Sequence, residues 1–325
     1  MAAFKILTAV LAVLCAWYFY NQETFSEEMI QGKRVLVTGS SSGIGEQMAY
    51  EFARLGAHVM LTARREERLQ QVVQKCRDLG AASASYVVAD MSNLTSARRV
   101  VEETKNHLEG LDFLVLNHVG GTRFGHFEGT IESVITSMTI NFFSYVQLTI
   151  SALKMLNESQ GSIIVVSSIS GRVQSPFAVP YAAAKFALEG FYTSLRSELH
   201  LRKADLPITV AVLGYIDTDS AVSSVHGKVK MAPSPKEDCA REIVKGGALR
   251  QREVFYPYWN IKLALLLRDW QEPVPAGMPV RWAPLRAAPG MRRGPPHCRF
   301  RMLSPDPPTS TSFSPLNCTS PKGPA

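Results

Sequence analysis

Tyr181 and Lys185 are the two residues of this sequence whose types and spacing point most directly to chemistry. On a helix, residues four positions apart lie on the same face, so these two side chains would project together. A free phenol has a pKa near ~10, and a neighbouring ammonium group lowers that value. A tyrosine in such a setting can give and take a proton near neutral pH. An isolated pair with this spacing is more often an ordinary surface pair, so the interpretation depends on the rest of the chain.

The elements that would position this pair form an alternating series of strands and helices. The residue pattern predicts strands over 34–38, 58–62, 85–89, 113–116, 162–168 and 208–213, with helices over 46–55, 66–79, 92–108, 131–156 and 181–202. Such alternation predicts an α/β fold, a Rossmann-type doubly wound parallel sheet. Ligands of these sheets bind at the carboxyl ends of the strands. We therefore expect a single domain over residues 30–267.

A glycine-rich turn follows the first predicted strand and precedes a helix. It comprises Gly39, Ser40, Ser41, Ser42, Gly43, Ile44 and Gly45. Glycine suits a tight turn in which the backbone must approach a phosphate closely, and a helix N-terminus attracts negative charge. Strand, glycine turn and helix together predict a dinucleotide site.

The second predicted strand ends at Ala63, Arg64 and Arg65. A site for NAD usually carries an acidic residue here, whereas an arginine suits the 2′-phosphate of NADP. The nearest acid is Glu66, so NADP(H) is favoured over NAD(H). The alternative interpretation is that the two arginines only cover the exposed start of the next helix.

Polar residues follow or accompany several other predicted elements. Asp90 and Asn117 stand at strand ends where a ligand would bind, whereas a lone histidine such as His118 is more often structural. Asn141 lies within an apolar helical stretch, where an amide either satisfies neighbouring backbone groups or belongs to a site. Ser168 ends the fifth strand with a hydroxyl.

Taken together, these motifs resemble those of the short-chain dehydrogenase/reductase family in order and spacing. The matching residues are Thr38-Gly39-x-x-x-Gly43-Ile44-Gly45, Asn141, Ser168 and Tyr181-x-x-x-Lys185. Within the family the chain is most similar to the 11β-hydroxysteroid dehydrogenases. That closer resemblance is carried by Leu116-Asn117-His118, Val165 to Ser168, Lys185 to Leu188, Val212 to Gly214, Ile216 to Thr218 and Gly246 to Gln251, and it covers about residues 1–260.

The resemblance implies a role for each matching residue. Tyr181 would transfer the substrate proton, Lys185 would lower its pKa and hold the nicotinamide ribose, Ser168 would bind the substrate oxygen, and Asn141 would hold a water. Cofactor contacts would come from the glycine turn, Ala63 to Arg65, Asp90, Met91, Asn117, His118, Val119, Tyr181, Lys185, Ile216, Asp217 and Thr218. Substrate contacts would come from Ser168 and Tyr181, and no metal is expected.

Two departures from the resembled enzymes bear on cofactor and substrate. Ser42 replaces a lysine that helps to bind the 2′-phosphate, so the NADP preference depends on Arg64 and Arg65. The residues from 268 to 325 do not resemble the family, and they hold thirteen of the nineteen prolines. Such composition disfavours helix and sheet and predicts a disordered tail.

Residues 1–22 are predicted to be a signal peptide or a signal anchor, because Lys5 precedes an apolar run that ends in an aromatic cluster. We expect an endoplasmic reticulum protein with a lumenal body, attached to the membrane through this segment, or a secreted protein if the segment is cleaved. Glycosylation sequons begin at Asn93, Asn157 and Asn317.

Composition excludes several other classes of function. The net charge of +7 resides mostly in residues 271–325, which leaves the body near neutral and predicts no nucleic-acid partner. The five cysteines show no metal spacing and no disulfide framework.

The resemblance implies an NADP-dependent oxidoreductase that acts on a hydroxysteroid or ketosteroid, or on a similar small apolar alcohol or carbonyl. A carbonyl or retinoid reductase of the same family, and a weakly active cofactor-binding protein with an altered C-terminus, are the alternatives. A homodimer is left open.

Overall fold

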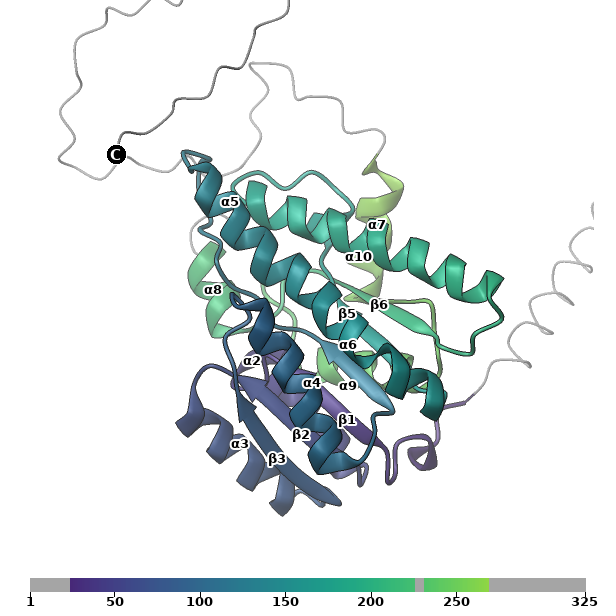
Figure 1. Cartoon of the computed structure of the whole chain (residues 1–325). Coiled ribbons are helices and arrows are strands. Elements are labelled where there is room, and N and C mark those ends of the chain that lie inside the picture. Colours follow the sequence, from purple (N-terminus) through teal and green to yellow (C-terminus); the bar gives the residue numbers. More distant parts are fainter. Residues whose placement is uncertain (1–23, 226–230, 269–325) are drawn as a thin grey trace, which may run out of the picture. The chain divides into compact units, whose positions relative to one another are not determined.

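A computed structural model of the chain describes residues 24–225 and 231–268. Within these residues, seven strands form one sheet in the order β3-β2-β1-β4-β5-β6-β7, and every neighbouring pair is parallel. The strands are β1 (Arg34–Thr38), β2 (His58–Ala63), β3 (Ser83–Val88), β4 (Phe113–Leu116), β5 (Ser162–Val166), β6 (Ile208–Leu213) and β7 (Glu253–Tyr256). The expected Rossmann-type α/β fold is therefore confirmed (Figure 1).

Helices connect the strands and cover both faces of the sheet. The described helices are η1 (Glu27–Met29), α2 (Gly43–Arg54), α3 (Glu66–Asp78), α4 (Leu94–Leu108), α5 (Ile131–Met138), η2 (Thr139–Phe143), α6 (Ser144–Ser159), η3 (Ile169–Gly171), α7 (Val179–Leu201), α8 (Asp219–Val225), α9 (Lys236–Ala248) and α10 (Tyr258–Leu266). Buried residues of α2, α3 and α9 form one apolar cluster with the sheet. Those of α4, α6, α7 and α10 form a second. Each face of the sheet therefore has its own core.

The central strands are apolar along their whole length because both of their faces are covered. Every residue of β4, β5 and β6 is buried. Along β1, Val35 is in register with Val59 of β2 on one side and with Phe113 of β4 on the other. Strands β2 and β3 are added on one side of β1, whereas β4 to β7 are added on the other side. Ligands of such sheets bind in the crevice at the carboxyl ends of the strands, beside the point where the strand order reverses.

Several details of the fold differ from the expectation drawn from the sequence, among them the end of β5, which stops at Val166 and leaves Ser168 beyond the strand. The helix expected over 131–156 is interrupted by the π-helical turn η2, and the helix expected from 92 begins at Leu94, with Asn93 as its N-cap. The seventh strand, β7, was not expected. It is a four-residue strand at the sheet edge, and so short a run carries little periodicity.

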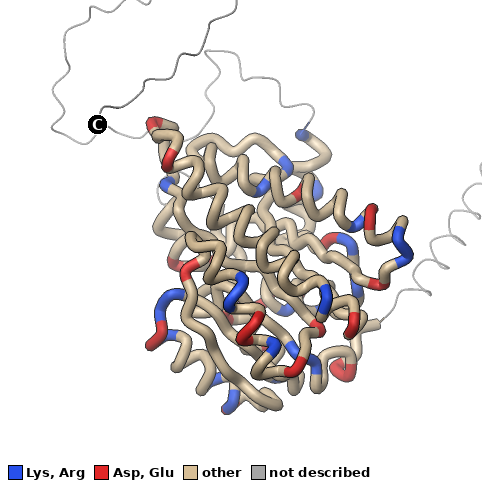
Figure 2. The backbone as a smooth tube through the Cα atoms, in the orientation of Figure 1, with Lys and Arg blue, Asp and Glu red and all other residues tan. Residues whose placement is uncertain are grey.

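The predicted N-terminal segment, residues 1–22, and nearly all of the predicted tail, 268–325, lie outside the described residues. Among the residues that are described, no helix is both long and apolar enough to cross a membrane. Acidic and basic residues are interspersed along the backbone of the described part in Figure 2.

Candidate active site

The glycine turn between β1 and α2 brings bare backbone to the start of the helix. Gly39 has a φ of +67°, and a Cβ there would lie 2.6 Å from the Cα of His118. Gly45 packs so closely against the Gly39 carbonyl and the Asn117 amide that no Cβ fits. Left-handed backbone and close packing both require glycine. The turn is thus shaped as the cradle at a helix N-terminus that accepts a pyrophosphate, and the residues present fit a dinucleotide.

Arg65 turns back from the end of β2 toward this cradle. Its Nη2 donates hydrogen bonds to Ser42 Oγ at 2.7 Å and to Ser41 Oγ at 3.1 Å. Arg65 is the N-cap residue of α3, but its side chain does not cap that helix. Arg64 is exposed beside it, and Ala63 ends β2. The guanidinium and two serine hydroxyls therefore form one polar group at the edge of the glycine turn.

Asn117 joins the end of β4 to the glycine turn. Its Nδ2 donates to the carbonyls of Thr38 at 3.1 Å and Gly39 at 3.4 Å, while its backbone N–H donates to Thr38 Oγ1 at 2.9 Å. Val119, two residues on, is 49% exposed and so remains available to a ligand. Asp90 and Met91 follow β3, where Asp90 Oδ1 accepts a hydrogen bond from the Ser92 N–H at 3.0 Å and Met91 is buried.

The side chain of His118 is committed to the interior. Nδ1 lies 2.9 Å from Thr38 Oγ1, and Nε2 lies 2.7 Å from Ser144 Oγ and 3.0 Å from the Ile140 carbonyl. Burial lowers the pKa of His118 to about 3, with the Ile140 carbonyl raising it and the nearby Lys185 charge lowering it further. The imidazole is neutral and ties β1 to η2 and α6. The side chain of His118 therefore has a structural role, as expected for a lone histidine.

Tyr181, Lys185 and Ser168 are brought together where α7 begins beside the carboxyl end of β5. Against the effect of burial, the Ser168 hydroxyl acts on the Tyr181 phenol and lowers its pKa. Lys185 Nζ donates to the Val166 carbonyl at 2.8 Å and lies 5.6 Å from the centroid of the Tyr181 ring. Ser168 Oγ also accepts from the Ser170 N–H at 3.2 Å. Hydroxyl, phenol and amine thus form one group, as their order in the sequence predicts.

The electrostatics of this group differ from the expected lowering of the tyrosine pKa. Burial raises the pKa of Tyr181, although the Ser168 hydroxyl acts in the opposite direction. Burial also lowers the pKa of Lys185 to about 7, against the pull of the Glu189 carboxylate. The amine is therefore only partly charged at neutral pH, which is why it does not lower the tyrosine pKa in this structure.

Asn141 lies in the middle of η2, fully buried. Its Nδ2 donates to the carbonyls of Gly120 at 2.7 Å and Ser137 at 2.8 Å, and its Oδ1 accepts from the Gly120 N–H at 3.1 Å. These bonds satisfy neighbouring backbone groups, which is one of the two interpretations left open by the sequence, and the assignment of Asn141 to the site stays a prediction. These contacts hold the loop after β4 against the interrupted helix.

The loop after β6 returns to the glycine turn. A Cβ on Gly43 would lie 3.1 Å from Cγ2 of Thr218. Ile216 is buried, and the Asp217 N–H donates to the Ser234 carbonyl at 2.8 Å. Residues from five strand ends thus meet along one edge of the sheet. The residues predicted for both ends of the cofactor therefore lie along this edge.

Two aromatic residues of this region were not identified from the sequence. Tyr145 of α6 donates a hydrogen bond from its hydroxyl to the His118 carbonyl at 2.7 Å, and its ring centroid lies 5.4 Å from Lys185 Nζ. Phe124 packs on Tyr181 with the ring centroids 5.5 Å apart. Tyr145 could have been found from its spacing, because it follows Asn141 by four residues. Phe124 lies in a loop, where the sequence gives no signal of its contact with Tyr181.

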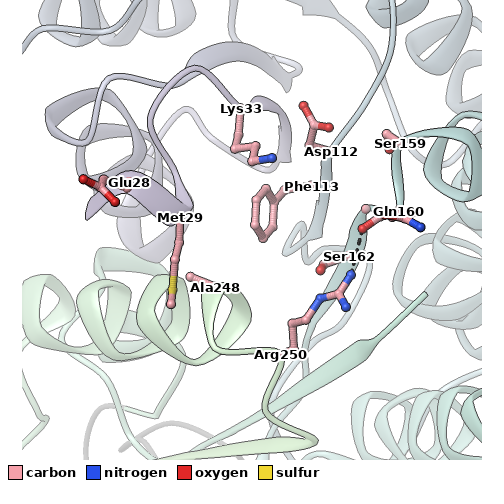
Figure 3. A pocket seen from close by; sticks show the side chains of 11 residues that line it. Glu28, Met29, Lys33, Asp112, Phe113, Ser159, Gln160, Ser162, Ala248 and Arg250 are labelled. Atoms are coloured by element: carbon pink, nitrogen blue, oxygen red, sulfur yellow. Dashed lines mark hydrogen bonds between the residues drawn. The ribbon is translucent and has the colours of Figure 1, made fainter. Parts of the chain in front are cut away.

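The pocket in Figure 3 lies elsewhere, at the edge of the sheet where β4 and β5 begin. It has a volume of about 290 Å³ and includes Phe113 and Ser162, the first residues of those strands. Arg250 crosses it and donates from Nη2 to the Gln160 carbonyl at 2.8 Å. None of the expected site residues lines this pocket.

Comparison with known proteins agrees with the fold and the site. The model of the short chain dehydrogenase family matches residues 33–228. A short chain dehydrogenase from Burkholderia cenocepacia, solved in complex with NADP, superposes with a TM-score of 0.61 at 28% identity, over 70% of this chain and 97% of that one. An NADH-dependent reductase of alginate metabolism shares the fold, with a TM-score of 0.62 at 23% identity, over 71% of this chain and 98% of that one.

The chain belongs to the short-chain dehydrogenase family and is a nicotinamide-dependent oxidoreductase that acts on CH–OH groups. It is 60% identical to the hydroxysteroid 11-beta-dehydrogenase 1-like protein A of Xenopus laevis, over 83% of this chain and 94% of the relative. It is 49% identical to the hydroxysteroid 11-beta-dehydrogenase 1-like protein of Gallus gallus, over 78% of this chain and 89% of the relative.

Proposed function

We propose that the protein is an NADP-dependent dehydrogenase that interconverts a hydroxysteroid and the corresponding ketosteroid. The observation that carries the proposal is the grouping of Ser168, Tyr181 and Lys185 at the carboxyl end of β5. The hydroxysteroid dehydrogenase name of its relatives supports the class of substrate.

A bound nicotinamide supplies or accepts the hydride, and the chain's own residues handle the proton and the substrate oxygen. Tyr181 gives its phenolic proton to the carbonyl oxygen in reduction and takes a proton from the alcohol in oxidation. Ser168 donates a hydrogen bond to the same oxygen and holds it beside Tyr181. Lys185 stabilises negative charge on Tyr181 when the amine is cationic.

Preference for the phosphorylated cofactor is supported by Arg65. Its guanidinium lies on Ser41 and Ser42 at the edge of the glycine turn. Arginine presents planar donors that match a phosphate, and no carboxylate in this group would repel one. The three side chains would hold the 2′-phosphate in place of the lysine that the resembled enzymes carry.

An apolar substrate is supported by the walls around Tyr181. The loop after β4 and the loop before α7 are joined by a 2.8 Å hydrogen bond from the Gly125 N–H to the Phe177 carbonyl. Phe124 packs on Tyr181, and His126 meets Phe177 with ring centroids 4.9 Å apart. These rings offer an apolar surface beside the reacting group, as a fused-ring substrate requires.

We also propose that the N-terminal segment directs the body into the endoplasmic reticulum lumen. Asn93 and Asn157 of the sequons are both exposed in the described part. The test is expression in cultured cells, followed by carbonate extraction and glycosidase digestion. Retention in the membrane with a glycosidase-sensitive mass supports an anchored lumenal protein. Protein in the medium supports cleavage, and an unshifted cytosolic protein overturns the proposal.

The function is tested by incubating the purified full chain with a panel of hydroxysteroids, ketosteroids, retinoids and aromatic carbonyls. Each compound is offered with NADP(H) and NAD(H), in both directions. We expect turnover of a steroid with NADP(H). In Tyr181→Phe we expect a loss of about 10²–10⁴-fold in kcat, the usual range for a proton-transfer group. Tyr258→Phe, at an exposed tyrosine of α10, is the matched control. Full activity of Tyr181→Phe would contradict the mechanism, and turnover of a retinoid alone would change the substrate class.

A further inference from the structure

Glu189 is a buried acidic residue that the reaction described above does not use. It lies on α7 one helical turn after Lys185, and only 7% of its surface is exposed. Neither carboxylate oxygen accepts an aligned hydrogen bond among the described residues. A buried carboxylate without such bonds is costly, so it requires a compensating charge.

Arg172 provides part of that compensation. Its Nη2 lies 2.5 Å from Oε2 of Glu189 and 2.5 Å from Oε1 of Glu253, although the approach to Glu189 is not aligned as a hydrogen bond. The preceding residue, Gly171, packs directly on the backbone of α7, where a Cβ would come within 2.8 Å of the Lys185 carbonyl oxygen. The close approach of η3 to this turn of α7 therefore positions Arg172 over Glu189.

The second part of the compensation is Lys185 itself. Residues four apart on a helix lie on the same face. The titratable side chains around Lys185 are Tyr181 and Glu189 on α7, Tyr145 on α6 and His118 after β4. Those around Glu189 are Lys185, Arg172, Glu253 of β7 and Arg196 of α7. Within the described residues, Glu189 is thus the carboxylate that acts on the Lys185 amine.

We propose that Glu189 is a positioning residue whose buried carboxylate, held in place by Arg172, favours the cationic form of Lys185. The proposal rests on the proposed function in one respect, which is that the reaction uses the positive charge of Lys185. The charge itself is a property of the protein without cofactor.

The direction of the effect follows from the two influences on the amine. Burial lowers the pKa of Lys185 to about 7, and the Glu189 carboxylate raises it. Removing the carboxylate charge therefore leaves burial unopposed and lowers the pKa further. Because an amine is cationic below its pKa, the variant loses the charge on Lys185 at a lower pH than the wild type.

The direct test is a titration of Lys185 in the cofactor-free full chain labelled with 15N-lysine, with the Nζ resonance assigned by its absence in Lys185→Arg. In Glu189→Gln we expect the midpoint to fall by about half a pH unit or more. Glu253→Gln is the matched control, because it removes the other carboxylate of Arg172 and should leave the midpoint unchanged. Equal shifts in both variants, or none in Glu189→Gln, would overturn the proposal.

If Glu189→Gln does not fold, the double variant Arg172→Gln with Glu189→Gln replaces it, since removing both partners leaves no uncompensated buried charge. The same lower midpoint is expected there, and an unchanged midpoint overturns the proposal.

A second readout is the dissociation constant of NADP+ by calorimetry across pH. We expect binding by the wild type to weaken as pH rises through about 7, and binding by Glu189→Gln to weaken from a lower pH. If the wild type binds no NADP+, the proposed function fails while the titration still decides the role of Glu189. Identical pH profiles for both proteins would contradict the role in cofactor binding.

Discussion

Lys185 Nζ donates a 2.8 Å hydrogen bond to the carbonyl oxygen of Val166, the last residue of β5. Ser168 follows Val166 by two residues, so one strand end positions both the amine and the hydroxyl of the site. Tyr181 lies one turn before Lys185 on α7, and against the effect of burial the Ser168 hydroxyl lowers the pKa of its phenol. A shift of α7 along β5 would therefore separate all three groups at once.

Replacing Lys185 with methionine should stabilise the protein while abolishing its activity. The pKa of the buried amine is lowered from 10.5 to about 7. Between these values the unfolded chain binds a proton that the folded chain does not, so this group makes wild-type stability rise with pH. Below pH 7 the buried amine destabilises the folded protein to its full extent. At pH 6 we expect Lys185→Met to raise the free energy of unfolding by roughly 1–3 kcal/mol, measured by urea denaturation.

Lys203→Met, at an exposed lysine after α7, is the control for that experiment. Its stability should follow the wild type at every pH. An equal gain in both variants, or a loss in Lys185→Met, would show that burial of the amine is not the cause.

His118 should make the protein sensitive to acid. Burial lowers the pKa of its imidazole to about 3 from 6.5. The unfolded chain therefore binds a proton that the folded chain excludes as pH falls between these values, and stability falls by up to about 1.4 kcal/mol per pH unit from this group. In His118→Asn we expect a shallower decline from pH 6.5 to pH 4, although the variant is less stable at pH 7.

The measurement is urea denaturation at half-unit steps of pH, compared with His200→Asn at an exposed histidine near the end of α7. That control should keep the wild-type slope. A wild-type slope in His118→Asn would mean that the imidazole is not the acid-sensitive group.

Arg65→Ala should weaken NADPH binding and leave NADH binding unchanged. The hydrogen bonds from Arg65 to Ser41 and Ser42 place its guanidinium beside the glycine turn. A hydrogen bond to a charged group contributes about 1.5–3 kcal/mol, so the KM for NADPH should rise by roughly tenfold or more. Arg68→Ala is the control, because Arg68 lies on the same helix but pairs with Glu46, and its KM for NADPH should stay near the wild-type value. A similar rise for NADH in Arg65→Ala would count against a 2′-phosphate contact.

Asn141→Ala should destabilise the protein through the loop after β4. The amide satisfies the N–H and C=O of Gly120 and the Ser137 carbonyl. Unpaired buried backbone groups cost about 1–3 kcal/mol, which thermal unfolding would detect as a lower Tm. Asn106→Ala, at an exposed position of α4, should leave the Tm nearly unchanged. If Asn141→Ala kept the wild-type Tm but lost activity, the amide would act in the site and not in the fold.

Much of the fold could be predicted from the sequence because its signals are local. The apolar runs of β1, β4 and β6 have the bounds that their residue types predict. The glycine turn could be placed because Gly39 and Gly43 require conformations that other residues rarely adopt. The π-turn at Asn141 could not, since the hydrogen bonds of that residue include one with Gly120, twenty-one residues away in the chain. Nor could β7, whose pairing with β6 defines it.

The class of fold, the glycine cradle and the order of Asn141, Ser168, Tyr181 and Lys185 could be inferred from the chain alone, because they depend on residue type, periodicity and spacing. The charge state of the site depends on the three-dimensional packing. Burial of Lys185, opposed by the Glu189 carboxylate, sets the pKa of the amine at about 7. Desolvation and Coulomb interactions depend on distances between elements, and a linear pattern does not contain those distances.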